Sequence, residues 1–142
     1  MTDLDIERAC ERLVLDFAYF SDRKDYESLA GLFTQEGTMT RPSRETLAGR
    51  AAILTAYQER SSTRITRHLC TNIRITVESG QRAKGWTYAL VFGADSSEPP
   101  DGQFGRKADT RSLIGEFEDE FHLTPDGWRI ASRIARFVMH QS

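Results

Sequence analysis

The sequence is poor in cysteine and has no long apolar run. Its two cysteines, Cys10 and Cys70, are widely separated; they are too few for a disulfide scaffold or a thiolate zinc site, and they favour a reducing compartment. No stretch approaches the ~20 apolar residues of a membrane-spanning helix. The acidic N-terminus, residues 1–5, lacks the apolar region of a signal peptide. We therefore expect a cytoplasmic protein with no membrane partner.

An excess of charge of either sign is also missing. The 142 residues include 19 Lys and Arg and 21 Asp and Glu, which gives a net charge of −2. Nucleic-acid-binding domains are usually clearly basic, so no nucleic-acid partner is expected. Apolar residues make up 39% and charged residues 28% of the chain, which is typical of a globular domain. The length fits a single domain over residues 1–142, without a repeat or linker.

The first sixty residues are patterned mainly as helices. Apolar residues at three- and four-residue spacing predict an amphipathic helix over residues 3–23, capped by Thr2 or Asp3. Downstream of it we expect a short helix, a short strand that ends at a proline, and a third helix. Their expected ranges are 26–33, 38–41 and 49–59.

From residue 64 onward the pattern is that of strands. Four are predicted, over residues 66–77, 84–93, 110–123 and 128–139. Segment 94–109 is rich in proline and glycine and is expected to be a mobile loop that can serve as a lid. Helices first and hairpin-connected strands second indicate the α+β class, with no parallel βαβ repeat.

Alternation in the first two strands assigns side chains to faces. In the first, it puts Leu69, Ile73, Ile75 and Val77 on one side, and Thr66, His68, Cys70 and Asn72 on the other. The second strand is apolar on both faces, with Trp86, Tyr88, Leu90 and Phe92 opposite Ala89 and Val91. A strand of this kind is covered on both sides. We expect helices on one side and another subunit, in a homodimer or homotrimer, on the other.

Three segments, taken in order, resemble a known superfamily. They read YFSDRKDY at residues 19–26, RHLCTN at 67–72 and DGWRI at 126–130. Their order and spacing resemble the SnoaL-like branch of the nuclear transport factor 2-like superfamily, over nearly the whole chain. The resemblance implies a cone-shaped α+β barrel, in which N-terminal helices pack on a strongly curved antiparallel sheet. It also implies that residues 1–142 form one SnoaL-like domain.

The resemblance further implies a set of site residues. Scytalone dehydratases and γ-hexachlorocyclohexane dehydrochlorinases of this superfamily place an aspartate after the first helix and a histidine on a later strand, which match Asp22 and His68. The dehydrochlorinases also have a pocket arginine, to which Arg133 corresponds. These three residues are the expected catalytic set. The expected substrate-binding wall consists of Phe17, Ala18, Tyr19, Ala89, Val91 and Phe117.

The chain also departs from both enzyme families. Where the scytalone dehydratases have a tyrosine and a second histidine, this chain has Ser21 and Gly93. Where the dehydrochlorinases have a lysine, it has Phe17. The substrate of neither family therefore carries over. Steroid isomerases share the fold, but their acidic base and oxyanion donors have no clear match here.

An aspartate–histidine pair suits proton abstraction. The carboxylate fixes the imidazole tautomer, and the second ring nitrogen accepts a proton; an ordinary imidazole titrates near pH 6.5. The hypothesis is a lyase, dehydratase- or dehydrohalogenase-like, or an isomerase, acting without cofactor or metal on a small apolar cyclic or polyketide-like molecule. Glu116, Glu118, Asp119 and Glu120 are expected to pair with arginines of the last strand and not to bind metal.

Other interpretations stay open at this point. His68 can be an ordinary strand histidine, Asp22 a helix-terminating residue, and Arg133 a salt-bridged or solvated side chain. The chain can then be a non-catalytic ligand-binding or assembly module of the same fold. A third possibility is an accessory subunit like the β-subunits of ring-hydroxylating oxygenases.

Overall fold

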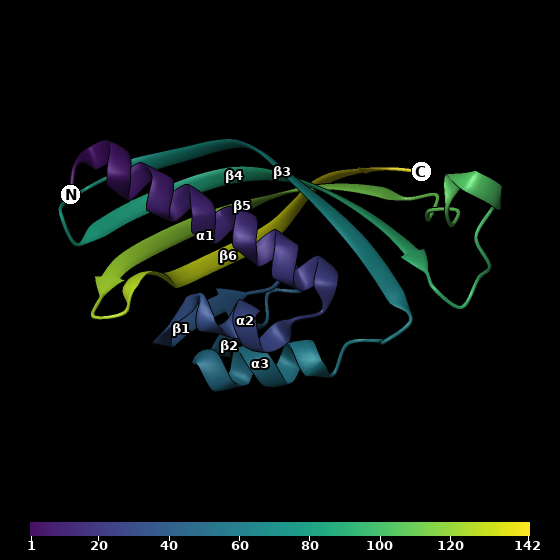
Figure 1. Cartoon of the computed structure of the whole chain (residues 1–142), viewed down its shortest axis with the longest axis horizontal. Helices are drawn as coiled ribbons and strands as arrows, with labels where there is room; N and C mark the ends of the chain where they lie inside the picture. Colours follow the sequence, from purple (N-terminus) through teal and green to yellow (C-terminus); the bar gives the residue numbers. More distant parts are fainter.

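Helices occupy the N-terminal part of the molecule and long strands the C-terminal part (Figure 1). The structure, a computed structural model, describes residues 1–142. The helices are α1 (Asp3–Arg23), α2 (Tyr26–Gly31) and α3 (Arg50–Gln58), with a short 3₁₀ helix, η1 (Gly102–Phe104). The strands are β1 (Phe33–Thr40), β2 (Thr46–Ala48), β3 (Arg64–Val77), β4 (Arg82–Asp95), β5 (Ser112–Thr124) and β6 (Gly127–Gln141).

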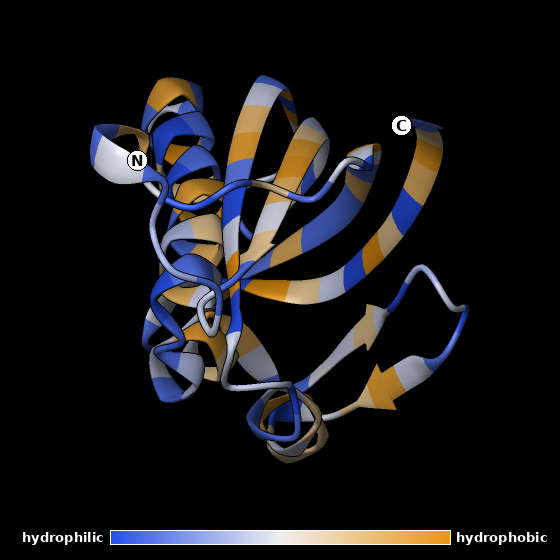
Figure 2. Cartoon of the chain, turned by 90° about the vertical axis from the view of Figure 1, so that its right-hand side faces the viewer, coloured by the Kyte–Doolittle hydropathy of each residue, from blue (hydrophilic) through white to orange (hydrophobic).

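The six strands form one curved sheet in the order β2-β1-β6-β5-β4-β3. Every neighbouring pair is antiparallel except β1 and β6, which run parallel. The predicted α+β cone is thus confirmed, but the sheet is mixed and not wholly antiparallel. The β1–β2 hairpin stands away from β3, so the sheet does not close into a barrel (Figures 1 and 2).

Helix α1 has the predicted bounds because both ends are capped. The Thr2 hydroxyl accepts a hydrogen bond from the Asp5 backbone N–H, and the Asp5 carboxylate accepts one from the Thr2 N–H. At the other end, Lys24 adopts a left-handed conformation with φ of 61° and stops the helix. Helix α1 lies across the sheet (Figure 1), and its buried residues run from Ile6 to Ser21.

The segment after α2 differs from the prediction. Helix α2 ends at Gly31, two residues before the predicted end, and the fully buried Phe33 already begins β1. Strand β1 therefore starts five residues earlier than expected, and the short β2 was not predicted. The reason is that residues 34–36 are polar and largely solvent-exposed, which hides the alternation of a strand.

A β-bulge changes the face assignment in β3. Two residues of β3, 72 and 73, lie opposite the single β4 residue Thr87, between the pairs Thr71–Tyr88 and Arg74–Trp86. Strand β3 thus carries one extra residue, and Asn72 has φ of 53°. The extra residue moves later side chains to the opposite face. Ile73, Ile75 and Val77 therefore pack on the core on the same side as Thr66, His68 and Cys70. The predicted opposition of these two groups was wrong.

A second bulge acts on β6. Phe121 pairs with Ile130 and Glu120 with Ser132, which leaves one β6 residue between these pairs without a partner. Ile130 before the bulge and Arg133 after it are consequently both fully buried. Without the bulge, residues 130 and 133 would point to opposite faces of the sheet, because they are an odd number of positions apart.

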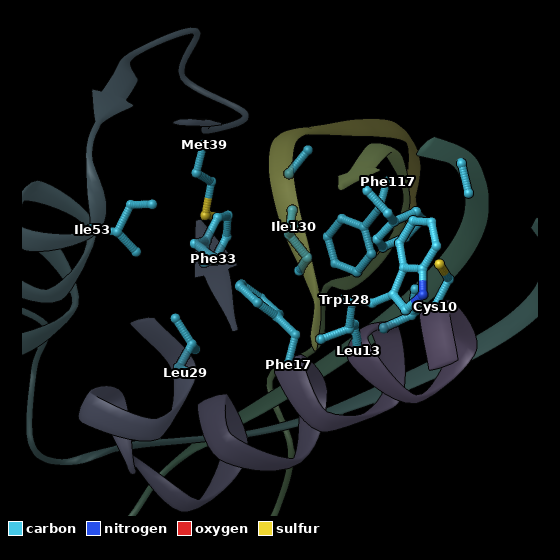
Figure 3. Packing of buried hydrophobic residues seen from close by; sticks show 14 of the residues in the cluster. Cys10, Leu13, Phe17, Leu29, Phe33, Met39, Ile53, Phe117, Trp128 and Ile130 are labelled. Carbon is cyan, nitrogen blue, oxygen red and sulfur yellow. The ribbon is translucent and has the colours of Figure 1, made fainter. Parts of the chain in front are cut away.

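Phe17 of α1 is the hub of the aromatic core (Figure 3). Its ring packs edge-on against Phe33 of β1, Tyr57 of α3 and Phe117 of β5, with centroid distances of 6.1, 6.1 and 6.0 Å. Each such aromatic pair adds about 0.5–1.5 kcal/mol beyond simple burial. One α1 side chain thereby connects the helix to strands β1 and β5 of the sheet and to helix α3.

The outer face of the sheet carries exposed aromatic side chains. Trp86, Tyr88 and Phe92 of β4 point away from the helices and are 39%, 47% and 38% exposed, while Ala83 and Ala89 of the same strand are buried. Strand β4 is thus apolar on both faces, as its sequence indicates, and the subunit expected over the outer face stays a prediction. None of the helices combines the length and apolar character needed to span a bilayer.

Candidate functional site

A cavity of about 310 Å³ lies on the helix side of the sheet. The C-terminal half of α1 contributes Phe17 to its wall, and strands β3, β4 and β5 contribute His68, Ala89 and Phe117. Val91 of β4 also lines it. Phe17, Ala89, Val91 and Phe117 were all predicted for the pocket wall, and the structure brings them together around one space.

Asp22 and His68 contact each other at this cavity. His68 Nδ1 lies 2.6 Å from Asp22 Oδ1, although the residues are 46 positions apart. The same carboxylate accepts two more hydrogen bonds, from the Thr66 hydroxyl at 2.9 Å and from the His68 backbone N–H at 2.9 Å. Both side chains of the pair are 12% exposed. The last turn of α1 and the beginning of β3 therefore hold the pair in one orientation.

The electrostatics of the pair define the imidazole tautomer. Burial by itself raises the pKa of Asp22, but the hydrogen bonds from His68 and Thr66 outweigh it and leave the pKa of Asp22 below its usual value. Asp22 is thus ionised at neutral pH. An ionised carboxylate can only accept hydrogen bonds, so the Nδ1 atom of His68 carries the proton.

The second ring nitrogen of His68 is left open. Nε2 has no hydrogen-bond partner in the protein, and it is not among the buried polar atoms that lack one. His68 lines the cavity, whereas Asp22 does not. The imidazole therefore contacts the carboxylate on one side and lines the cavity, while its Nε2 atom has no partner in the protein.

Two of the predicted wall residues do not line the cavity. Tyr19 is 54% exposed, and its ring lies beneath the Arg23 guanidinium on the outside of α1. Ala18 is buried but does not contribute to the wall. Successive residues of a helix point about 100° apart, so three neighbours cannot all face one space. The expected substrate contacts of Tyr19 and Ala18 were wrong, and Phe17 alone of the three lines the cavity.

Arg133 points inward, but it lies in the core and not in the cavity wall. Its side chain has no solvent exposure and forms an ion pair with Asp119. It does not line the cavity. The salt-bridged interpretation therefore fits its position, although its Nη1 atom is buried without a hydrogen-bond partner. Glu118 likewise pairs with Arg136, so the expected pairing of β5 acids with β6 arginines is confirmed at both places.

The chain matches a known protein family over most of its length. A family model described as a SnoaL-like domain matches residues 2–134. The chain belongs to the SnoaL-like domain family. A comparison with curated protein sequences finds no match.

Several solved structures have a fold similar to that of this SnoaL-like domain. A scytalone dehydratase candidate from Novosphingobium aromaticivorans is 24% identical, with a TM-score of 0.82 over 98% of this chain and 88% of that one. A hexachlorocyclohexane dehydrochlorinase (LinA, type 2) is 17% identical, with a TM-score of 0.78 over 96% and 91%. ActVI-ORFA from Streptomyces coelicolor is 18% identical, with a TM-score of 0.73 over 96% and 98%. At these identities the likeness establishes the fold.

The SnoaL-like domain also has wall residues that the sequence did not single out. Tyr57 of α3 and Met39 of β1 line the cavity and are buried, and the Tyr57 hydroxyl lies 3.6 Å from the Met39 sulfur. Burial raises the pKa of Tyr57, so its hydroxyl stays protonated. The helix over 49–59 was predicted, but only the tertiary fold shows that the face with Tyr57 borders a cavity.

An ion pair covers the cavity next to Gly93. Arg64 at the start of β3 pairs with Asp109, which precedes β5, and both line the cavity. A side chain at position 93 would collide with them, because a Cβ atom there would lie 2.5 Å from the Arg64 Nη2 atom and 3.1 Å from the Asp109 Oδ2 atom. The place of the second histidine of the scytalone dehydratases is thus taken by this ion pair. No group of three or more His, Cys, Asp or Glu side chains is arranged to hold a metal ion.

Proposed function

We propose that this SnoaL-like domain is a cofactor-independent lyase or isomerase in which His68, oriented by Asp22, abstracts a proton from carbon. The observation that carries the proposal is the 2.6 Å contact between His68 Nδ1 and Asp22 Oδ1, in a ring that lines the cavity and whose Nε2 atom has no partner in the protein. General-base catalysis by a positioned histidine is typically worth about 10²–10⁴ in rate. In this proposal Arg133 supports the pocket residues Phe17 and Phe117, which it contacts, and does not contact the substrate.

The proposed step balances without an added reagent. The C–H bond of the substrate breaks, its proton goes to His68 Nε2, and Asp22 stabilises the imidazolium that forms. In a lyase, the electron pair forms a double bond as a hydroxide or halide leaves the adjacent carbon. The imidazolium then gives its proton to the leaving hydroxide or to water. In an isomerase, the same proton returns to a different carbon of the substrate.

The cavity supports a small and largely apolar reacting group. Phe17, Ala89, Val91 and Phe117 surround the space beside His68, and its volume of about 310 Å³ lies near the lower limit for small-molecule sites. The names of two structural neighbours, a dehydratase candidate and a dehydrochlorinase, describe eliminations. A C–H acid within a cyclic or polyketide-like molecule would suit such a site.

The test is exchange of carbon-bound hydrogen. We would incubate the protein with 2-tetralone, a small apolar cyclic ketone, in D₂O and follow loss of the acidic C–H signal by NMR. Wild-type protein should accelerate exchange over buffer, and His68→Gln should lose about 10²-fold or more of that acceleration. His122→Gln, at the far end of β5, is the matched control and should behave like wild type.

Two outcomes would contradict the proposal. Equal exchange rates for wild type and His68→Gln would remove His68 from the mechanism. Saturable binding of 2-tetralone with no acceleration by the wild type would instead favour a non-catalytic binding module. Circular dichroism of each variant establishes that the fold is retained.

The outer face of the sheet supports a second copy of this chain as its partner. Trp86, Tyr88 and Phe92 form part of an exposed apolar surface there, and contiguous surfaces of this kind commonly mark interfaces. We expect a homodimer or homotrimer by size-exclusion chromatography with light scattering, and Tyr88→Glu should weaken it. A stable monomer would contradict this and would favour the accessory-subunit alternative.

A further inference from the structure

The mouth of the cavity is electropositive although the whole chain is not. Among the residues that line the cavity five are basic and two acidic, an excess of three positive charges, whereas the chain as a whole carries −2. The basic residues are Lys24, Arg60, Arg64, Arg111 and Arg136, and the acidic ones are Asp109 and Glu116. The Arg136 guanidinium stacks on Trp86 of the outer face, and Glu116 pairs in register with Tyr88 of that face. Four cations and one anion are left for the cavity side, which is the same excess of three. An apolar molecule without charge would gain nothing from such an arrangement.

Two of these cations already have carboxylate partners. Arg64 pairs with Asp109, and Arg136 pairs with Glu118, which does not line the cavity. Of the remaining three, Lys24 donates one hydrogen bond to the Ser62 carbonyl. Arg60 and Arg111 are exposed and form no ion pair. The cavity therefore offers unneutralised cationic groups from the end of α1, the end of α3 and the beginning of β5.

Arg60 is the best positioned of the three. Its guanidinium lies 5.1 Å from the centroid of the Tyr57 ring, and Tyr57 is itself a buried wall residue. A stacked guanidinium has lost part of its freedom before a ligand arrives, and its remaining N–H groups match the two oxygens of a carboxylate. Arg111, which directly precedes β5, lines the same cavity.

We propose that the natural ligand of this cavity is an organic acid whose carboxylate binds Arg60 and Arg111 at the mouth, while its apolar ring extends inward to His68. The location of the reacting carbon beside His68 rests on the proposed function; the carboxylate site does not.

The test compares three ligands of the same shape by isothermal titration calorimetry. The probes are 2-naphthoate, its neutral analogue 2-naphthamide and 2-naphthyl phosphate. Wild-type protein should bind 2-naphthoate at least about tenfold more tightly than 2-naphthamide. Added salt should reduce this difference in affinity. The double variant Arg60→Gln/Arg111→Gln should lose this preference, because it weakens binding of 2-naphthoate far more than binding of 2-naphthamide.

The matched control is Arg8→Gln, on an exposed part of the first turns of α1 and away from the cavity; it should bind like wild type. Equal affinity of wild type for 2-naphthoate and 2-naphthamide would overturn the proposal, as would an unchanged preference in the double variant. Binding of 2-naphthyl phosphate at least tenfold tighter than 2-naphthoate would replace the carboxylate by a phosphate and overturn the stated class. His68→Gln should keep the preference for 2-naphthoate, so a failure of the proton-transfer proposal is seen separately, in the exchange assay.

Discussion

Asp119 and Arg133 form a bidentate ion pair between β5 and β6 that has no exposure to solvent. Arg133 Nε donates to Asp119 Oδ1 at 2.7 Å and Nη2 donates to Oδ2 at 2.8 Å. The guanidinium lies between the rings of Phe17 and Phe117, 4.4 and 4.0 Å from their centroids. Both rings line the cavity, so the ion pair supports one wall of the site from behind.

Removing one member of this ion pair should cost far more stability than replacing both. Asp119→Ala leaves a buried, uncompensated guanidinium, and we expect the free energy of unfolding to fall by about 3–5 kcal/mol. The double variant Asp119→Leu/Arg133→Met leaves no unpaired charge and should recover most of this loss. Urea unfolding followed by circular dichroism measures both. Equal losses in the single and double variants would show that the uncompensated charge is not the cause.

The Asp22 carboxylate should make stability depend on acid pH. Its pKa is lowered in the folded state, so the unfolded chain binds a proton first as pH falls from neutral. The stabilisation is fully present above the ordinary value of about 3.8 and is lost as pH falls through the lower folded value. Wild type should therefore exceed Asp22→Asn in stability at pH 6, and the difference should shrink by pH 3. Asp101→Asn, at an exposed loop carboxylate, is the control, and a pH-independent difference for Asp22→Asn would contradict the linkage.

Much of the fold follows from local sequence patterns. The apolar stripe and the cap of α1 predict its bounds correctly, and hairpin turns such as that before Gly127 define the long strands. The bulges in β3 and β6 could not be predicted from the sequence. Pairing with β4 and β5 determines where the extra residue lies, and this leaves no local signal. A single bulge at Asn72 was enough to invert the predicted faces of half of β3.

The candidate site could be predicted only in part. Asp22 and His68 were identified through a resemblance, and the structure places their side chains in contact. The prediction that Tyr19 lines the pocket was wrong, because a helical stretch that is apolar on all sides does not show which side chains face the sheet. The basic mouth could not be foreseen, because Arg60 follows α3 and Arg111 precedes β5, and only the tertiary fold brings both to one cavity.

The two thiols should differ in reactivity in the native state, with Cys10 the better protected. Cys10 is fully buried, and burial raises the pKa of its thiol to about 12; burial also raises the pKa of Cys70, which is partly exposed. The thiolate is the reactive form, so in the Cys70→Ser variant Cys10 should react with Ellman's reagent at pH 8 only after unfolding in urea. Cys10→Ala should react faster in the native state, through the partly exposed Cys70. Rapid native labelling of Cys70→Ser would contradict the burial of Cys10.

Gly93 should hold the segment between η1 and β5 near the cavity by leaving room for the Arg64–Asp109 ion pair. In Gly93→Ala the new methyl group displaces the ends of both side chains, which are flexible and 42% and 43% exposed. Exposed pairs contribute about 0–1 kcal/mol, so global stability should change little. Amide hydrogen exchange in residues 105–111 should instead become several-fold faster, and Asp109→Asn should produce the same effect. Gly80→Ala is the control, because a Cβ atom there meets nothing within 4 Å. If Gly93→Ala and Gly80→Ala exchange alike, the ion pair does not hold this segment.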